Sequence, residues 1–215
     1  MRKIKLFACA VLLMFMSAAS LIAQHVSGTP ASPTRAKQVV EEFWTLETSG
    51  KLLTEDGWKS ACKYYKQPAG ARVRNWSIIV IAPDWSVWPP YISGNAASVI
   101  IGLEIIGKVD SQMNFSPHRS EAVKEGVQYA VALTRESCSL GQNGKQVPNV
   151  AATPDWRLDR PLGTANMYLS LDAALRYVAG VHERSPEGTL KGNASATLRR
   201  LQRWNKTSSR PRQPN

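Results

Sequence analysis

The sequence has few of the residues that build common catalytic and metal centres. It contains three cysteines and three histidines in 215 residues, with no Cys-x-x-Cys pair and no paired histidine spacing. A metal site is therefore not expected. The Gly-x-Ser-x-Gly motif of serine hydrolases and the glycine-rich phosphate loop are also missing, and no cofactor is expected.

Acidic residues are missing from one whole segment of the chain. The formal net charge is +11, yet residues 25–187 are nearly neutral, whereas residues 188–215 hold seven basic residues and no acid. Nucleic-acid binding by the body of the protein is therefore not expected. A basic end instead predicts binding to an anionic envelope polymer or lipid surface. The residues predicted to do so are Arg199, Arg200, Arg203, Lys206, Arg210 and Arg212.

Long apolar runs are absent beyond the N-terminus. Residues 1–24 combine a basic start, an apolar stretch and small residues, which together are typical of a secretory signal. We predict cleavage between Ala19 and Gln24, a linker over 25–33 and export to the periplasm or medium; an uncleaved anchor is the alternative. Cleavage would leave Cys62 and Cys138, either as one disulfide or as two buried thiols.

Hydrophobic periodicity predicts two helices first, from Thr34 to Gly50 and from Thr54 to Pro68. Strands follow, and residues 141–154 read as a loop because they are polar. Helices from Ser170 and from Thr189 to Trp204 return at the end. Helices segregated from an antiparallel sheet define an α+β fold. The expected strands are 75–82, 97–106, 126–135 and 155–158, with 85–92 as an edge strand or loop and 109–115 as a continuation.

Three stretches carry a resemblance to a known superfamily. Residues 39–65 (VVEEFWTLETSGKLLTEDGWKSACKYY), 107–115 with the DWRL strand from Asp155, and 168–178 resemble secreted members of the nuclear transport factor 2-like superfamily. The resemblance implies a cone formed by a curved antiparallel sheet over residues 34–165, with N-terminal helices in its mouth. It also implies a C-terminal helical extension (166–205), and pairing of two copies through the open sheet face. The remaining residues, 206–215, are expected to form a basic disordered tail.

The superfamily's acid–base enzymes hold a carboxylate or a His–Asp pair inside the cone, where burial raises a carboxyl pKa. The candidates here are Glu104, Asp110 and His118. Glu104 lies in an otherwise apolar stretch, but strand alternation can equally send it outward. Asp110 is also suited to a turn, and His118 to the surface.

Aromatic residues are the richest feature, with seven tryptophans in the chain. In one interpretation they line the cone and bind a small apolar ligand. In the other, they pack the core and a loop. The residues concerned are Trp44, Trp58, Trp85, Trp88 and Tyr91.

Three functions follow from these observations. The first is an exported, non-catalytic domain that binds a small apolar ligand or a protein partner in the cone. The second is an envelope-associated protein held by its basic C-terminal segment. The third is an isomerase- or hydrolase-like enzyme that uses a buried carboxylate. Fold alone does not choose among them.

Overall fold

A computed structural model describes residues 32–68, 76–118, 123–159 and 166–208. The predicted signal and nearly all of the linker lie outside these residues, as does the tail beyond Ser208. The helices are α2 (Pro33–Thr48), η1 (Lys51–Leu53), α3 (Glu55–Ala61), η2 (Cys62–Tyr64), α4 (Leu171–Arg184) and α5 (Thr189–Ser208).

Local sequence signals explain where the first helices begin. Ser32 caps α2 through its side chain, and Pro33 occupies the first turn, where no amide donor is needed. Thr54 caps α3, as the sequence predicts, by accepting a hydrogen bond from the amide of Gly57. However, α3 ends at Ala61 and continues as the 3-10 turn η2, so the second predicted helix is shorter than expected.

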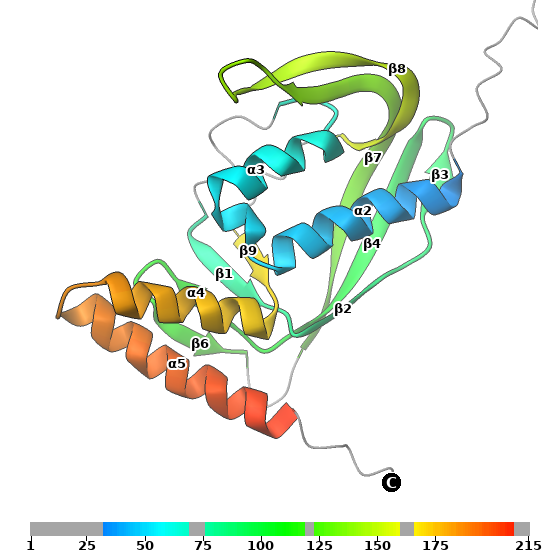
Figure 1. Ribbon diagram of the computed structural model, residues 1–215. Helices are drawn as coiled ribbons and strands as arrows, with labels where there is room; N and C mark the ends of the chain where they lie inside the picture. Colours follow the sequence, from blue (N-terminus) through cyan, green and yellow to red (C-terminus); the bar gives the residue numbers. More distant parts are fainter. Residues whose placement is uncertain (1–31, 69–75, 119–122, 160–165, 209–215) are drawn as a thin grey trace, which may run out of the picture. The chain divides into compact units, whose positions relative to one another are not determined.

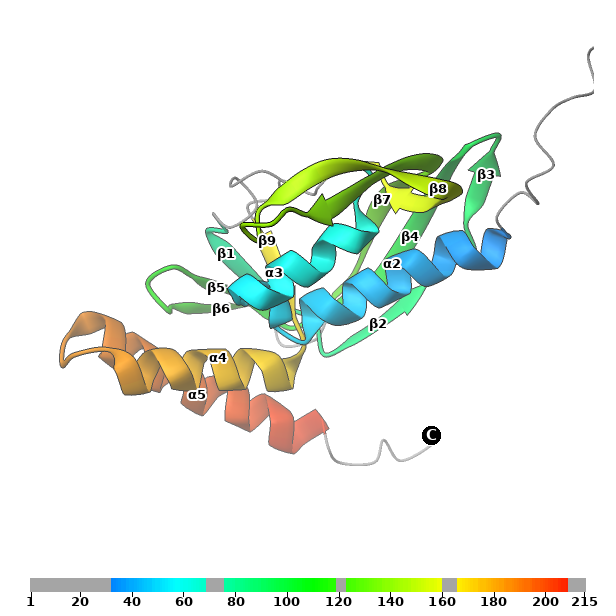
Figure 2. The same ribbon diagram turned by 45° about the horizontal axis from the view of Figure 1, so that its top comes forward.

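The strands form a curled sheet, a half-barrel, between the N-terminal and C-terminal helices (Figures 1 and 2), which confirms the α+β class. Their backbone pairings define a four-stranded part of the order β6-β5-β1-β9 and a separate five-stranded part of the order β2-β4-β7-β8, in which β3 also pairs with β4. The strands are β1 (Ile78–Ile81), β2 (Asp84–Val87), β3 (Tyr91–Ser93), β4 (Ala96–Ile105), β5 (Gly107–Asp110), β6 (Phe115–Pro117), β7 (Val123–Leu140), β8 (Gln146–Leu158) and β9 (Asn166–Leu169).

One strand was not anticipated. β9 pairs in parallel with β1, with Ile79 opposite Met167, so the sheet is not purely antiparallel. A parallel neighbour needs a long crossover connection, and here the connection contains all of the other described strands, β2 to β8. The segment predicted as a purely helical extension therefore begins with a strand of the sheet.

The predicted loop over residues 141–154 is wrong for most of its length. β8 starts at Gln146 and pairs antiparallel with β7 from Leu140 back to Val131. The register shifts between Thr134 and Glu136, and such a bulge bends a strand. Figure 1 shows the far part of this hairpin curling over α3. Only the turn itself, with Gly144 at a positive φ of 69°, remains from the predicted loop.

The C-terminal helices pack against each other and against the sheet. Ser170 caps α4 through its hydroxyl, as expected. α5 extends to Ser208, so Lys206 belongs to the helix rather than to the predicted tail. None of the helices in the described ranges combines the length and the apolar character that crossing a membrane requires.

Cys62 and Cys138 form a disulfide, with Cα atoms 5.2 Å apart. This resolves the alternative between a bridge and two separate thiols. The bond joins η2 to β7, and the amide of Cys138 also donates to the carbonyl of Tyr65. Covalent and backbone bonds thus fix the short N-terminal helices against the bent strand.

Candidate functional site

The strand register places three rows of side chains across β2, β4 and β7 on the outer face of the sheet, away from α2. Along β4 the odd-numbered residues from Ala97 to Ile105 are buried, so the even-numbered residues face outward. The backbone pairings fix the members of each row. The rows are Trp88, Ile100 and Gln128; Ser86, Gly102 and Gly126; and Asp84, Glu104 and Lys124.

The glycine row lets an aromatic ring lie against the sheet. The amide of Trp88 donates to the carbonyl of Ile100 at 2.8 Å, which anchors this residue beside β4. A Cβ built on Gly102 would lie 3.1 Å from Nε1 of Trp88 and 3.4 Å from Oγ of Ser86. Gly102 therefore makes room for the indole, whose residue stays 55% exposed. Gly126, in the next strand, leaves the adjoining floor bare.

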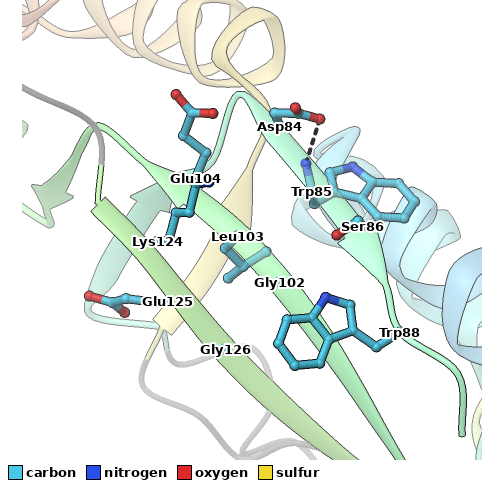
Figure 3. A pocket seen from close by; sticks show the side chains of 10 residues that line it. All are labelled: Asp84, Trp85, Ser86, Trp88, Gly102, Leu103, Glu104, Lys124, Glu125 and Gly126. Atoms are coloured by element: carbon cyan, nitrogen blue, oxygen red, sulfur yellow. Dashed lines mark hydrogen bonds between the residues drawn. The ribbon is translucent and has the colours of Figure 1, made fainter.

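These rows line an open groove with a volume of about 510 Å³. Figure 3 shows Trp88 lying beside Gly102 at one end, with the carboxylates of Asp84 and Glu104 at the other. Among the described residues that line the groove, Asp84, Glu104 and Lys124 form one outward-facing row of two acids and one lysine, whereas Glu125 pairs with the inward-facing Leu103. The groove thus combines an aromatic wall, a floor of backbone and a net negative end.

The three predicted acid–base residues are not gathered in a buried site. Glu104 lies on the outer face of the sheet, which is the outward orientation given above as the alternative. Asp110 accepts hydrogen bonds from the amides of Gln112 and Asn114 and from the Asn114 side chain, which lower its pKa. It is a turn residue. His118 is half-buried, with Nε2 3.0 Å from Oε1 of Glu125.

The aromatic residues divide between the core and the outer face. Trp44 and Trp58 are 0% and 5% exposed, so they pack the core and do not line an open pocket. Trp85 is partly buried, with its ring centroid 6.5 Å from that of Trp44. Trp88 and Tyr91 remain exposed. Of these two, Trp88 lines the groove and Tyr91 does not, so a ligand-binding role for the aromatic residues stays a prediction.

A buried carboxyl exists at a position that the sequence reasoning missed. Glu47 on α2 is 6% exposed, and burial raises its pKa to about 8, partly offset by a hydrogen bond from the amide of Tyr168. Burial raises the pKa of Tyr65 and Tyr129, which are both 1% exposed, and the negative charge of Glu47 raises it further. Its spacing, three residues after Trp44 and four after Phe43 on the same helix, was the available signal. Because buried aromatic side chains surround it, we assign it a structural role.

The predicted anionic-surface residues separate into different environments. Arg199 and Arg203 are exposed on α5, as is Lys206. Arg200 is exposed as well, but it also donates to the carbonyl of Phe115 at 3.1 Å, which gives it a role in docking the helix. Arg210 and Arg212 lie outside the described residues.

A scan against models of protein families found no match, and searches of the curated proteins and of the solved structures found none either. The resemblance to the nuclear transport factor 2-like superfamily therefore stays a prediction, carried by the sequence stretches named above. The function has to be argued from the groove itself.

Proposed function

We propose that this chain is an exported binding domain whose site is the outer groove at Trp88, rather than the interior of the cone. The observation that carries the proposal is the exposed Trp88 indole packed on Gly102. An exposed tryptophan over a glycine floor offers a large apolar surface that a ligand can cover without displacing side chains. Inside the curled sheet, the corresponding space holds buried aromatic side chains.

The ligand class follows from the chemistry of the groove. The acidic end favours a cation, since opposite charges raise both affinity and association rate. The open glycine floor admits a main chain, and aromatic-lined grooves commonly receive extended, proline-containing peptides. The ligand we propose is therefore a basic, extended segment of a protein partner. No step of chemistry is needed for this role.

A fluorescein-labelled Arg-Pro repeat octapeptide is a direct probe of this proposal. Its fluorescence anisotropy is expected to rise on titration with the chain, and a Glu-Pro repeat of the same length is expected to give no rise. The double variant Arg210→Glu with Arg212→Glu is titrated beside the natural chain. These arginines belong to the chain's own basic end and would compete with a basic probe for an acidic groove. Failure of both chains to bind the Arg-Pro probe would overturn the proposal.

The matched variant is Gly126→Val. A Cβ on Gly126 meets only a methyl group of Ile100, at 3.7 Å, and valine suits a strand. The variant should therefore fold while its side chain fills the groove floor. We expect at least a tenfold loss of probe affinity with an unchanged thermal midpoint. Equal affinity would show that the probe binds elsewhere.

A second function is supported by the exposed face of α5. Arg199, Arg203 and Lys206 recur at helical spacing and are exposed. Such a face can bind an anionic lipid or polymer surface, each charge adding about 1 kcal/mol near a membrane. Co-sedimentation with vesicles containing 30% phosphatidylserine, by the natural chain and by Arg199→Glu with Arg203→Glu, tests it. Equal co-sedimentation would exclude this face.

A further inference from the structure

Hydrogen bonds fix the course of α5 alongside the chain that leads into β6. Asn193, Thr197 and Arg200 donate in turn to the carbonyls of Gln112, Met113 and Phe115. Successive turns of the helix therefore follow the chain into and along β6. The residues beyond Arg200 continue in the direction in which β6 runs on to His118.

His118 connects that end of β6 to the groove. Its amide donates to the carbonyl of Ile106, directly after β4, and its ring lies 3.0 Å from Glu125, which lines the groove. In both ribbon views, the C-terminal end of α5 lies on the side of the sheet where β2 begins (Figures 1 and 2). The end of α5 and the start of β2, which begins at Asp84, therefore lie on the same side of the sheet.

Residues 209–215 have the sequence Ser-Arg-Pro-Arg-Gln-Pro-Asn. They carry two arginines, two prolines and no acid, which matches the class of ligand that the groove is suited to bind. Seven residues in extended conformation reach at most about 25 Å. Tethering at this length gives an effective concentration on the order of millimolar, so that even a weak contact is occupied.

We propose that residues 209–215 fold back and occupy the groove of their own chain, with the arginines toward Asp84 and Glu104 and a proline against Trp88. This inference rests on the proposed function, because it assigns that same groove a built-in competitor. A partner with a basic segment then binds only after displacing the tail. The tail regulates access to the site without any change in the sheet.

The titration with the Arg-Pro probe separates this inference from the proposed function. The double variant Arg210→Glu with Arg212→Glu is expected to bind the probe about three- to tenfold more tightly than the natural chain does. The matched control, Arg199→Glu with Arg203→Glu, changes the net charge by the same amount on the exposed face of α5. The inference predicts natural affinity for this control. Equal affinity of the natural chain and the tail variant would overturn the tail contact while leaving the groove's function intact.

A measurement without the probe tests the contact directly. The amide resonances of Gly102 and Gly126 are expected to shift between the natural chain and the tail variant, and not in the Arg199, Arg203 control. The difference should shrink in 0.5 M NaCl, because salt screens exposed charges. It should not depend on protein concentration between 20 μM and 500 μM. Identical spectra would overturn the inference, and a concentration-dependent difference would overturn its intrachain form in favour of a second copy.

Discussion

The backbone amide of Tyr168 donates to Oε1 of Glu47 at a distance of 3.2 Å, which joins the end of α2 to β9. The two residues are 121 positions apart in the chain. This bond satisfies one acceptor of a carboxyl that is otherwise surrounded by buried aromatic residues. It also explains why a titratable group is tolerated in the interior.

The first prediction is that stability falls as the pH rises. The pKa of Glu47 is about 8 in the folded chain against 4.5 as its ordinary value, so between these values the folded state binds a proton that the unfolded state has lost. The contribution of Glu47 is complete below pH 4.5. It declines by roughly 1.4 kcal/mol per pH unit up to about pH 8. Urea titrations at pH 5, 6, 7 and 8 measure this decline.

The variant Glu47→Gln is expected to remove this slope and to be the more stable protein at pH 8. The neighbouring phenols remain neutral in this range, since burial raises the pKa of Tyr65 and Tyr129 further above 10. Glu41→Gln, on an exposed part of α2, is the control and should keep the slope. A slope retained in Glu47→Gln would place the titrating group elsewhere.

The second prediction concerns the disulfide. Cys62 and Cys138 are 76 positions apart, and closing a loop of that size contributes about 4 kcal/mol in the chain-entropy model. The double variant Cys62→Ser with Cys138→Ser should lose about that much in the free energy of unfolding, measured with urea. The natural chain treated with a reductant should show the same loss. Labelling of Cys62 or Cys138 by a thiol reagent in the natural chain under denaturing, non-reducing conditions would contradict the bond, whereas labelling of Cys9 would not.

The third prediction contrasts two glycines. A Cβ on Gly107 would lie 2.5 Å from Cε2 of Phe115 and 2.7 Å from the carbonyl oxygen of Ser116, whereas nothing lies within 4 Å of one on Gly192. Gly107→Ala should therefore cost roughly 1–3 kcal/mol through overpacking. Gly192→Ala should instead stabilise α5 by roughly 0.5–1 kcal/mol. Thermal unfolding followed by circular dichroism gives both signs, and destabilisation by Gly192→Ala would contradict the exposed position of that residue.

The fourth prediction concerns the ion pair that ties α2 to β8. Nε and Nη2 of Arg35 donate to Oδ1 and Oδ2 of Asp155 at 3.2 and 3.1 Å. Both side chains are partly exposed, so a double-mutant cycle of Arg35→Ala and Asp155→Ala should give a coupling of about 1 kcal/mol at pH 7. Burial raises the pKa of Asp155, but the hydrogen bond and the charge attraction from Arg35 lower it, so that the pKa lies below its ordinary value. The coupling energy should therefore persist at every pH above the ordinary carboxyl pKa, and it should disappear as the pH falls below that pKa. Coupling that is unchanged at pH 2.5 would exclude an ionic origin.

Local sequence signals were sufficient to predict features that depend on residues close to each other in the chain. Caps at Thr54 and Ser170 could be recognised because a hydroxyl side chain precedes an apolar helical period. Along β4, the sequence left both orientations of Glu104 open, and the structure shows the outward one. The caps depend on residues close in sequence, and the structure confirms them.

Features that depend on distant pairing could not be predicted in this way. β8 is exposed on both sides for most of its length, so it has no alternation, and it is held by its backbone bonds to β7. β9 is a strand because β1 lies beside it. The groove could not be predicted because its floor is two glycines whose proximity comes from strand register, which the pattern of carboxylates and tryptophans in the sequence does not give.

The position of the disulfide has a consequence for proteolysis. Strands β1 to β6 all lie between Cys62 and Cys138, so a single peptide-bond cleavage in that interval leaves both fragments joined by sulfur. A nicked molecule of this protein would therefore migrate as one band on a gel until a reductant is added. Its backbone pairings between β1, β4 and the later strands would also hold the fragments in place.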